Sequence, residues 1–249
     1  MLFEMNEDIA RIGLQASMKR IFSKTHTKLI VEFDSKQTET ALQTKPIVIV
    51  ANHPYDADVV SLFASLPSRS DAYLIFSSAF YGICPALNHH TIPVYIDHHN
   101  RHKRKLVFMG ALLRFFHPRR TYDLQEEHEK NVESIHMASN KLDAGGLVAI
   151  LPGRRSPDGT WFSGVGHMIA GVNDRKKISI VFAHISGTGN KDYLRLVPWI
   201  QKLLPAISVF FSEPYAYLDV LGQRDDGKRI TRKLQEQYNR WRNLLQLAS

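Results

Sequence analysis

The sequence predicts an α/β fold in which a mixed, largely parallel central sheet is flanked by helices. Short runs rich in Val and Ile are apolar at nearly every position, as in parallel strands buried on both faces. Between them, other segments carry apolar residues at helical intervals, and this alternation favours a parallel sheet. A chain of 249 residues can bury a sizeable core, so we expect a single domain over residues 1–249.

The order of the elements follows from these patterns. Strands are expected, the first of them at an edge of the sheet, at 29–33, 47–51, 72–76, 92–96, 147–151, 178–185, 194–199 and 207–211. Helices are expected at 5–22, 56–66, 105–117, 131–142 and 225–247. The last of these forms a closing helix within residues 222–249, and Gly145 and Gly146 are expected to end the one before it.

The N-terminal segment, within residues 1–25, has the pattern of an amphipathic helix. Its apolar residues are spaced among charges, and Lys19, Arg20 and Lys24 cluster near its end. Such a helix can lie in a membrane interface or pack on the chain's own core, and the sequence leaves both alternatives open.

The most informative segment is Asn52-His53-Pro54-Tyr55-Asp56-Ala57-Asp58, which follows the expected strand 47–51. His53 falls in the turn between a strand and a helix, the edge at which open α/β sheets bind ligands. We expect Asp58 to fold back and orient His53, which then acts as a general base, because a carboxylate on one ring nitrogen stabilises the imidazolium. The alternative is a capping residue, Asn52, Asp56 or Asp58, beside a histidine that merely ends a strand.

A second segment places two arginines in the turn after the expected strand 147–151. Arg154, Arg155 and Ser156 follow Pro152 and Gly153 there. The planar guanidinium suits phosphate because it donates two parallel hydrogen bonds and stays charged. The alternative is a solvated basic hairpin tip.

Together these segments resemble the glycerophospholipid acyltransferases of the lysophosphatidic acid acyltransferase type. The segment around His53 and Asp58 is similar to the first motif of that family. Three further blocks follow in the family's order, at 92–101, 151–170 and 178–185, so that the resemblance covers about residues 45 to 190. It implies that His53 is the catalytic base and Asp58 its partner.

The resemblance also implies binding residues, although the chain departs from the family pattern at them. It places Arg154 or Arg155, with Ser156 and Arg101, on an acidic acceptor headgroup. Gly153 stands where the family has a glutamate, His98 stands where it has an arginine, and the fourth block lacks its proline. The catalytic pair is intact while the acceptor-binding elements differ, so the acceptor stays open.

The reaction implied is transfer of a fatty acyl group from acyl-CoA or acyl-carrier protein to a hydroxyl of a lysophospholipid-like acceptor. These thioesters are co-substrates, and no cofactor is expected. The expected partners are the donor, the acceptor, a membrane surface and an acyl carrier protein. Two alternatives remain: the same chemistry on a lyso-ornithine lipid, a sugar or a small metabolite, and a non-catalytic lipid- or phosphate-binding protein at the membrane surface.

Composition narrows the function classes. The net charge of +8 and the pI near 9.5 favour anionic partners, but no nucleic-acid-binding signature is present. The single Cys84 suits a reducing compartment and is expected to be buried. Neither a metal-binding motif nor a Gly-x-Ser-x-Gly elbow occurs, so we expect no metal site and no serine hydrolase. With no signal peptide or membrane span evident, we expect a cytoplasmic protein, peripheral on the membrane face.

Overall fold

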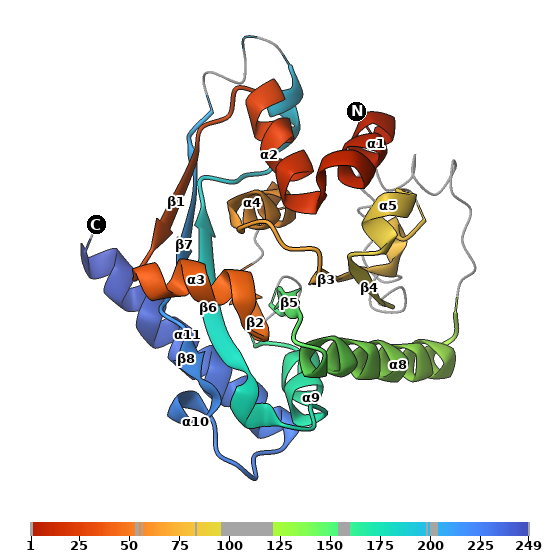
Figure 1. The fold of residues 1–249 in the computed structure, drawn as a ribbon, viewed down its shortest axis with the longest axis vertical. Helices are drawn as coiled ribbons and strands as arrows, with labels where there is room; N and C mark the ends of the chain where they lie inside the picture. The colour runs from red at the N-terminus through yellow and green to blue at the C-terminus, as the bar shows by residue number, and fades with distance from the viewer. Residues whose placement is uncertain are drawn as a thin grey trace.

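The structure is a computed structural model that describes residues 2–52, 55, 57–82, 84–95, 122–153, 160–197, 199 and 204–248. Its strands are β1 (Leu29–Phe33), β2 (Ile47–Ala51), β3 (Ala72–Ser77), β4 (Thr91–Val94), β5 (Leu147–Ile150), β6 (Ser179–Ser186), β7 (Ile207–Phe211) and β8 (Tyr215–Ala216). They form one sheet in the order β1-β7-β6-β2-β5-β3-β4, with β8 paired to β6 (Figure 1).

Most strand pairs of this sheet are parallel. β2 pairs in parallel with β5 and β6, β3 with β5 and β4, and β1 with β7. β6 is antiparallel to β7 and to β8. The mixed, largely parallel sheet expected from the sequence is confirmed, as is the position of β1 at an edge.

Helices cover both faces of the sheet. They are α1 (Leu2–Ile12), α2 (Leu14–Lys24), α3 (Lys36–Thr44), α4 (Ala57–Ser65), α5 (Pro85–Asn88), α8 (Leu124–Asp143), α9 (Gly164–Ala170), α10 (Tyr217–Val220) and α11 (Gly227–Ala248). Three short 3-10 helices, η1 (Ser78–Phe80), η2 (Arg175–Lys177) and η3 (Asp192–Leu196), complete the described elements.

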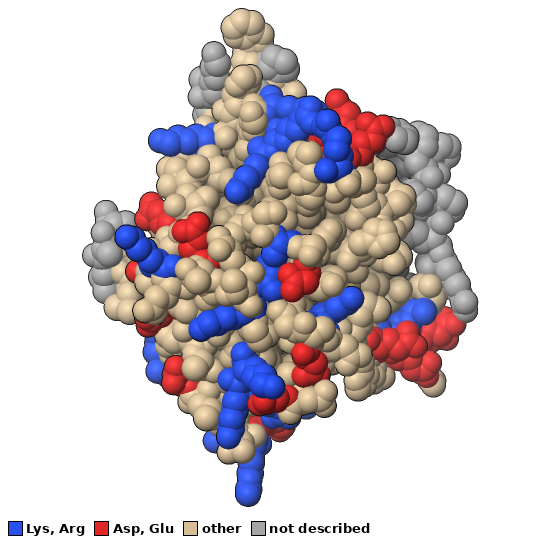
Figure 2. All heavy atoms as spheres, viewed as in Figure 1, with Lys and Arg blue, Asp and Glu red and all other residues tan. Residues whose placement is uncertain are grey.

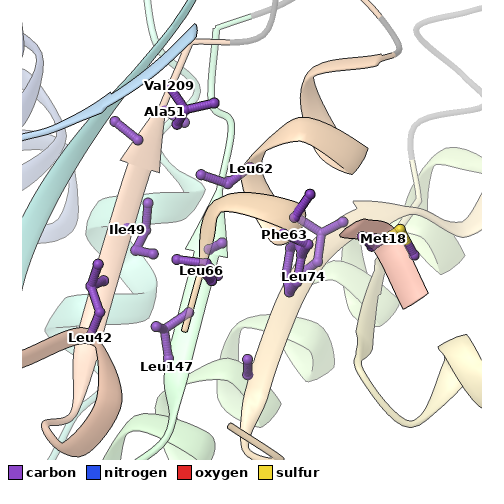
Figure 3. Packing of buried hydrophobic residues seen from close by; sticks show 14 of the residues in the cluster. Met18, Leu42, Ile49, Ala51, Leu62, Phe63, Leu66, Leu74, Leu147 and Val209 are labelled. Carbon is purple, nitrogen blue, oxygen red and sulfur yellow. The ribbon is translucent and has the colours of Figure 1, made fainter. Parts of the chain in front are cut away.

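The alternating side chains of β2 divide the core into two layers. Ile47, Ile49 and Ala51 belong to a cluster with residues of α2, α3 and α4 (Figure 3). Val48 and Val50 belong to a second cluster with residues of α8, α9 and α11. Every residue of β2 is buried, which explains why its sequence is an unbroken apolar run.

The N-terminal segment forms two helices, so the single helix expected over 5–22 was wrong. Gly13 separates α1 from α2 with a φ of 85°, a conformation that glycine adopts without steric cost. The apolar residues Ile9, Leu14, Met18 and Phe22 are buried in the first core layer. For these residues the structure shows packing on the chain's own core.

Three further expectations needed correction. The strand expected at 194–199 was wrong: η3 occupies Asp192–Leu196, because the Asp192 carboxylate accepts hydrogen bonds from the N–H of Gly189 and from Arg195 and so stabilises a turn. α8 begins at Leu124 instead of 131, because Asp123 and Glu126 form a capping box. α3 was not expected; its N-cap Ser35 accepts a hydrogen bond from the N–H of Thr38.

The other expected elements agree with the structure or fall outside it. α11 confirms the closing helix expected at 225–247. α4 begins at Ala57, one residue after the expected start. The helix expected at 105–117 and the end of the strand expected at 92–96 lie outside the described residues.

Candidate functional site

The carboxyl ends of β2, β5 and β6 meet at one edge of the sheet. Val50 of β2 lies opposite Ile150 of β5, and Ala51 lies opposite Ala183 of β6. The segments that follow β2 and β5 therefore start side by side, at the edge where α/β sheets bind ligands, and β6 continues past them to Ser186. Both motifs singled out in the sequence begin here.

Asn52 fixes the start of the first motif. Its side-chain nitrogen donates to the carbonyl of Ile185 at 2.8 Å, and its side-chain oxygen accepts from the N–H of Ile185 at 2.7 Å. The side chain thus continues the ladder between β2 and β6 beyond the last paired backbone residue. Asn52 ties the turn to the sheet and does not cap α4.

Asp58 occupies the first turn of α4 and is fully buried, with a relative exposure of 0%. Its Oδ2 accepts a hydrogen bond from the backbone N–H of Tyr55 at 2.6 Å. The carboxylate therefore folds back into the turn between β2 and α4, and the helix dipole favours its charge there. His53, Pro54 and Asp56 lie outside the described residues, so a contact between His53 and Asp58 stays a prediction.

The second motif leaves β5 and returns at the same place. The N–H of Phe162 donates to the carbonyl of Pro152 at 3.2 Å, and the N–H of Trp161 donates to the side chain of Gln235 on α11 at 3.1 Å. The Trp161 ring also packs on Tyr238 of α11, with ring centroids 5.3 Å apart. Both ends of this loop are therefore held at the carboxyl edge of the sheet.

The predicted binding residues themselves are not described. Arg154, Arg155 and Ser156 belong to the part of this loop outside the described residues, and Arg101 also lies outside them. Their roles remain predictions.

The structure leaves little room for a side chain at Gly153. A Cβ at this position would lie 3.0 Å from Cδ1 and 3.1 Å from Nε1 of the Trp161 indole. A glutamate there would require the indole ring to move.

The polar cluster around His184 was not identified from the sequence. Nδ1 of His184 lies 2.9 Å from the hydroxyl of Tyr238, so Trp161, Tyr238 and His184 form a continuous chain of contacts from the loop base to β6. The signal in the sequence was a histidine between Ala183 and Ile185 in the largely apolar strand β6.

Burial sets the protonation of this cluster. Burial lowers the pKa of His184 below its ordinary value, the charge of Arg242 lowers it further, and the charge of Asp58 opposes both by raising it. Burial also raises the pKa of the Tyr238 hydroxyl. At neutral pH the cluster therefore presents a neutral imidazole and a neutral phenol, which can hold a hydrogen bond but add no charge to the site.

Other candidate chemistry is limited. Cys84 is buried in the first core layer, as expected, with its sulfur 3.5 Å from the side-chain oxygen of Asn6. Among the described residues, no group of three His, Cys, Asp or Glu side chains is placed to hold a metal ion. None of the described helices is long and apolar enough to cross a membrane.

Comparison with known proteins gives the following result. No protein-family model and no curated protein sequence match the chain. Among solved structures, the chain is similar to the 1-acyl-sn-glycerophosphate (LPA) acyltransferase PlsC from Thermotoga maritima, with 16% sequence identity, coverage of 94% of this chain and 81% of that chain, and a TM-score of 0.47.

Proposed function

We propose that the chain is an O-acyltransferase, which moves a fatty acyl group from an acyl thioester to a hydroxyl of a lysophospholipid-like acceptor. The observation that carries the proposal is the buried Asp58 carboxylate, folded back into the turn at the carboxyl edge of the sheet. A buried carboxylate is costly unless a cation or hydrogen-bond donors compensate it. An imidazole in the same turn that becomes positively charged during the reaction suits that environment.

In the proposed reaction, His53 accepts the proton of the acceptor hydroxyl as its oxygen attacks the thioester carbonyl. The new C–O bond gives a tetrahedral oxyanion, which backbone N–H groups near the helix start stabilise. The C–S bond then breaks, and the imidazolium returns its proton to the departing thiolate. Asp58 orients the ring and stabilises its charged form. No covalent enzyme intermediate is required.

The acceptor headgroup is assigned to the arginine-bearing loop. Arg154 and Arg155 follow Gly153 directly in the chain, and the base of their loop is held at the same sheet edge as Asn52. In this proposal they bind an acidic headgroup, together with Ser156 and Arg101. The acyl chain extends toward lipid, so the enzyme works peripherally at a membrane surface, with acyl-CoA or acyl-carrier protein as donor.

The contact between Gly153 and Trp161 favours a second candidate, the same chemistry on a different acceptor. A glutamate at Gly153 would need the Trp161 indole to move, and without that carboxylate we expect a headgroup site that differs in shape and charge from that of the family the sequence resembles. A lyso-ornithine lipid, a sugar or another small hydroxyl metabolite then replaces the glycerophosphate acceptor.

The test is transfer by the purified protein. We would incubate it with acyl-CoA and with acyl-carrier protein, each with a panel of lysophospholipids, lyso-ornithine lipid and small alcohols, and detect products by mass spectrometry. His53→Ala should lower the rate by about 10²–10⁴-fold. Asp58→Asn keeps an acceptor for the Tyr55 N–H but removes the charge, so it should also lower the rate while the protein stays folded.

The matched control is His136→Ala, which removes an exposed histidine on α8 and should leave the rate unchanged. If the folded wild-type protein transfers no acyl group from either donor, yet binds lysolipid with and without His53, the non-catalytic alternative replaces this proposal.

A further inference from the structure

The segment after β6 exposes large apolar side chains at its surface. Tyr193, Leu196, Val197 and Trp199 have relative exposures of 62%, 49%, 40% and 81%. We call these four residues the apolar tip. Single exposed apolar residues are ordinary on protein surfaces, but four large ones within seven positions of the chain point to an interaction site.

An internal arginine holds the tip in this arrangement. Arg195 has a relative exposure of 6%, and its guanidinium donates to the Asp192 carboxylate at 2.9 Å and to the carbonyls of Gly187 and Pro205, each at 3.0 Å. Usually the arginine of such a segment faces solvent and the apolar residues face inward. Here the Arg195 guanidinium is buried and donates hydrogen bonds within the segment, whereas the side chains of Tyr193 and Leu196 are exposed.

The neck of this segment is also tightly packed. Gly187 has a φ of 80°, and a Cβ there would lie 2.0 Å from the carbonyl oxygen of Ala206. The two ends of the segment therefore touch, and glycine is required at their contact. The two ends of the segment that carries the apolar tip are therefore held against each other.

The tip projects from the same edge of the sheet as the candidate site. β6 ends at Ser186, and its neighbour β2 ends at Ala51, directly before Asn52. In Figure 1 the segment that follows β6 lies at the top of the view, beside α2. The returning chain lies beside β1, because the N–H of Ile207 donates to the carbonyl of Lys28 at 2.9 Å.

Basic residues flank the tip. Lys24, His26 and Lys28 are exposed in the segment that joins α2 to β1, and Lys191 is exposed at the start of η3. Figure 2 shows Lys and Arg side chains gathered over α2 at the same end of the molecule. The chain as a whole carries a net charge of +8. An apolar projection beside cations is complementary to an anionic lipid surface.

We propose that the apolar tip inserts into the interface of an anionic membrane and so holds the candidate site against the lipid that contains its substrate. Trp and Tyr prefer the headgroup level of bilayers, and Leu and Val reach the acyl chains below it. Ile9, Leu14, Met18 and Phe22 of α1 and α2 are buried in the core and are not available to lipid, whereas all four residues of the tip are exposed. The importance of this contact for turnover rests on the proposed function.

Trp199 provides a direct test. The chain has three tryptophans, and Trp161 and Trp241 pack against Tyr238 in the second core layer. Vesicles of phosphatidylcholine with anionic phosphatidylglycerol should shift the emission of the full chain to shorter wavelength and protect it from an aqueous quencher. Trp199→Phe should remove this shift, which assigns the signal to the tip.

Binding to the same vesicles by sedimentation tests the whole tip. The triple variant Tyr193→Ser/Leu196→Ser/Trp199→Ser should bind at least about tenfold more weakly, since it loses three interfacial side chains. The matched control is Leu218→Ser, which changes an exposed leucine on α10. α10 follows β8, which pairs with the amino end of β6, so this control lies at the opposite end of the sheet.

Two outcomes overturn the proposal. One is a triple variant that is folded by circular dichroism and binds vesicles as tightly as wild type. The other is a Trp199 signal that responds to purified acyl carrier protein and not to vesicles, which makes the tip a protein-docking surface. Failure of the proposed function looks different: the folded wild-type protein transfers no acyl group to any acceptor, yet it still binds vesicles through the tip and loses this binding in the triple variant.

Discussion

The side-chain amide of Asn52 pairs with both the N–H and the carbonyl of Ile185, so that a side chain takes the place of backbone in the ladder between β2 and β6. A backbone continuing along β2 would extend the strand through the site. By making these two bonds with its side chain, Asn52 lets the main chain leave the sheet one residue before His53. The turn that carries the proposed base therefore starts from a fixed point.

Replacing Asn52 should weaken both the fold and the site. Asn52→Ala leaves the backbone N–H and carbonyl of the buried Ile185 without these partners, which should cost about 1–3 kcal/mol of unfolding free energy. Acyl transfer should fall further than this loss of stability explains, because the turn is no longer fixed. Urea denaturation and the transfer assay measure the two effects.

Asn52→Asp is the informative companion. Its carboxylate can still accept from the Ile185 N–H, but it faces the Ile185 carbonyl without a donor. We expect it to be as destabilising as Asn52→Ala at neutral pH and less so in acid, where the carboxyl group gains a proton to donate. Wild-type stability in both variants would contradict a structural role for the pair.

Asn52 and His184 show which parts of the candidate site can be predicted from the sequence. Asn52 and Asp58 belong to one short segment after a recognisable strand, so local patterns placed both at the carboxyl edge. His184 and Tyr238 are 54 residues apart, and their contact depends on how α11 crosses the sheet. No local pattern encodes that crossing, so the cluster was missed.

The fold was predicted best where burial dictates the sequence. Strands buried on both faces, such as β2, have an apolar run that fixes their type. The region 194–199 has an apolar run as well, but Arg195 forms the hydrogen bonds that turn the chain, and its neighbours are exposed. Apolar residues of a sequence are usually expected to be buried. In this region the hydrogen bonds of Arg195 bury the arginine instead, and Leu196 and Val197 beside it are exposed.

Gly153 and Trp161 should be energetically coupled. Gly153→Glu places a Cβ about 3 Å from the indole, and overpacking of this kind should cost about 1–3 kcal/mol. In a Trp161→Ala background the same substitution should cost clearly less, because the ring no longer fills the space. Denaturation of the four proteins in this double-mutant cycle gives the coupling energy.

A second glycine supplies the control for this cycle. A Cβ at Gly164 meets nothing within 4 Å, so Gly164→Ala should be neutral or slightly stabilising in both backgrounds. An equal cost of Gly153→Glu with and without the Trp161 ring would remove the steric explanation for the missing glutamate.

Arg69 should be essential for stability at the opposite edge of the sheet. Its buried guanidinium binds the Asp71 carboxylate and donates to the carbonyls of Leu42, Lys45 and Gly145. The guanidinium also holds the pKa of Asp71 below its usual range. Arg69→Met keeps much of the side-chain volume but leaves these acceptors without a donor, so it should cost about 2–4 kcal/mol.

An exposed arginine tests whether the cost comes from burial. Arg11 forms an ion pair with Asp8 at the surface, and Arg11→Met should cost less than about 1 kcal/mol. Urea denaturation of both variants makes the comparison. Equal costs would mean that the carbonyl contacts of Arg69 contribute nothing measurable.

His184 should make the protein less stable in mild acid. Its pKa is lowered from the ordinary value of 6.5, chiefly by burial, so the unfolded chain binds a proton more readily than the folded protein does. The contribution of neutral His184 to the free energy of unfolding is fully present above pH 6.5. It is lost as the pH falls from there through the lowered pKa of His184 in the folded protein. His184→Gln, which cannot gain this proton, should therefore lose less stability than wild type between about pH 7.5 and about pH 5.5.

Subtracting the free energy of unfolding of His184→Gln from that of wild type at each pH removes the contributions of the other titrating groups. Tyr238→Phe removes the hydrogen bond at Nδ1 but keeps the burial that chiefly lowers the pKa, so its pH dependence should stay close to that of wild type. A wild-type pH dependence in His184→Gln would show that His184 titrates at its ordinary pKa in the folded protein, and would place it in contact with water at the sheet edge.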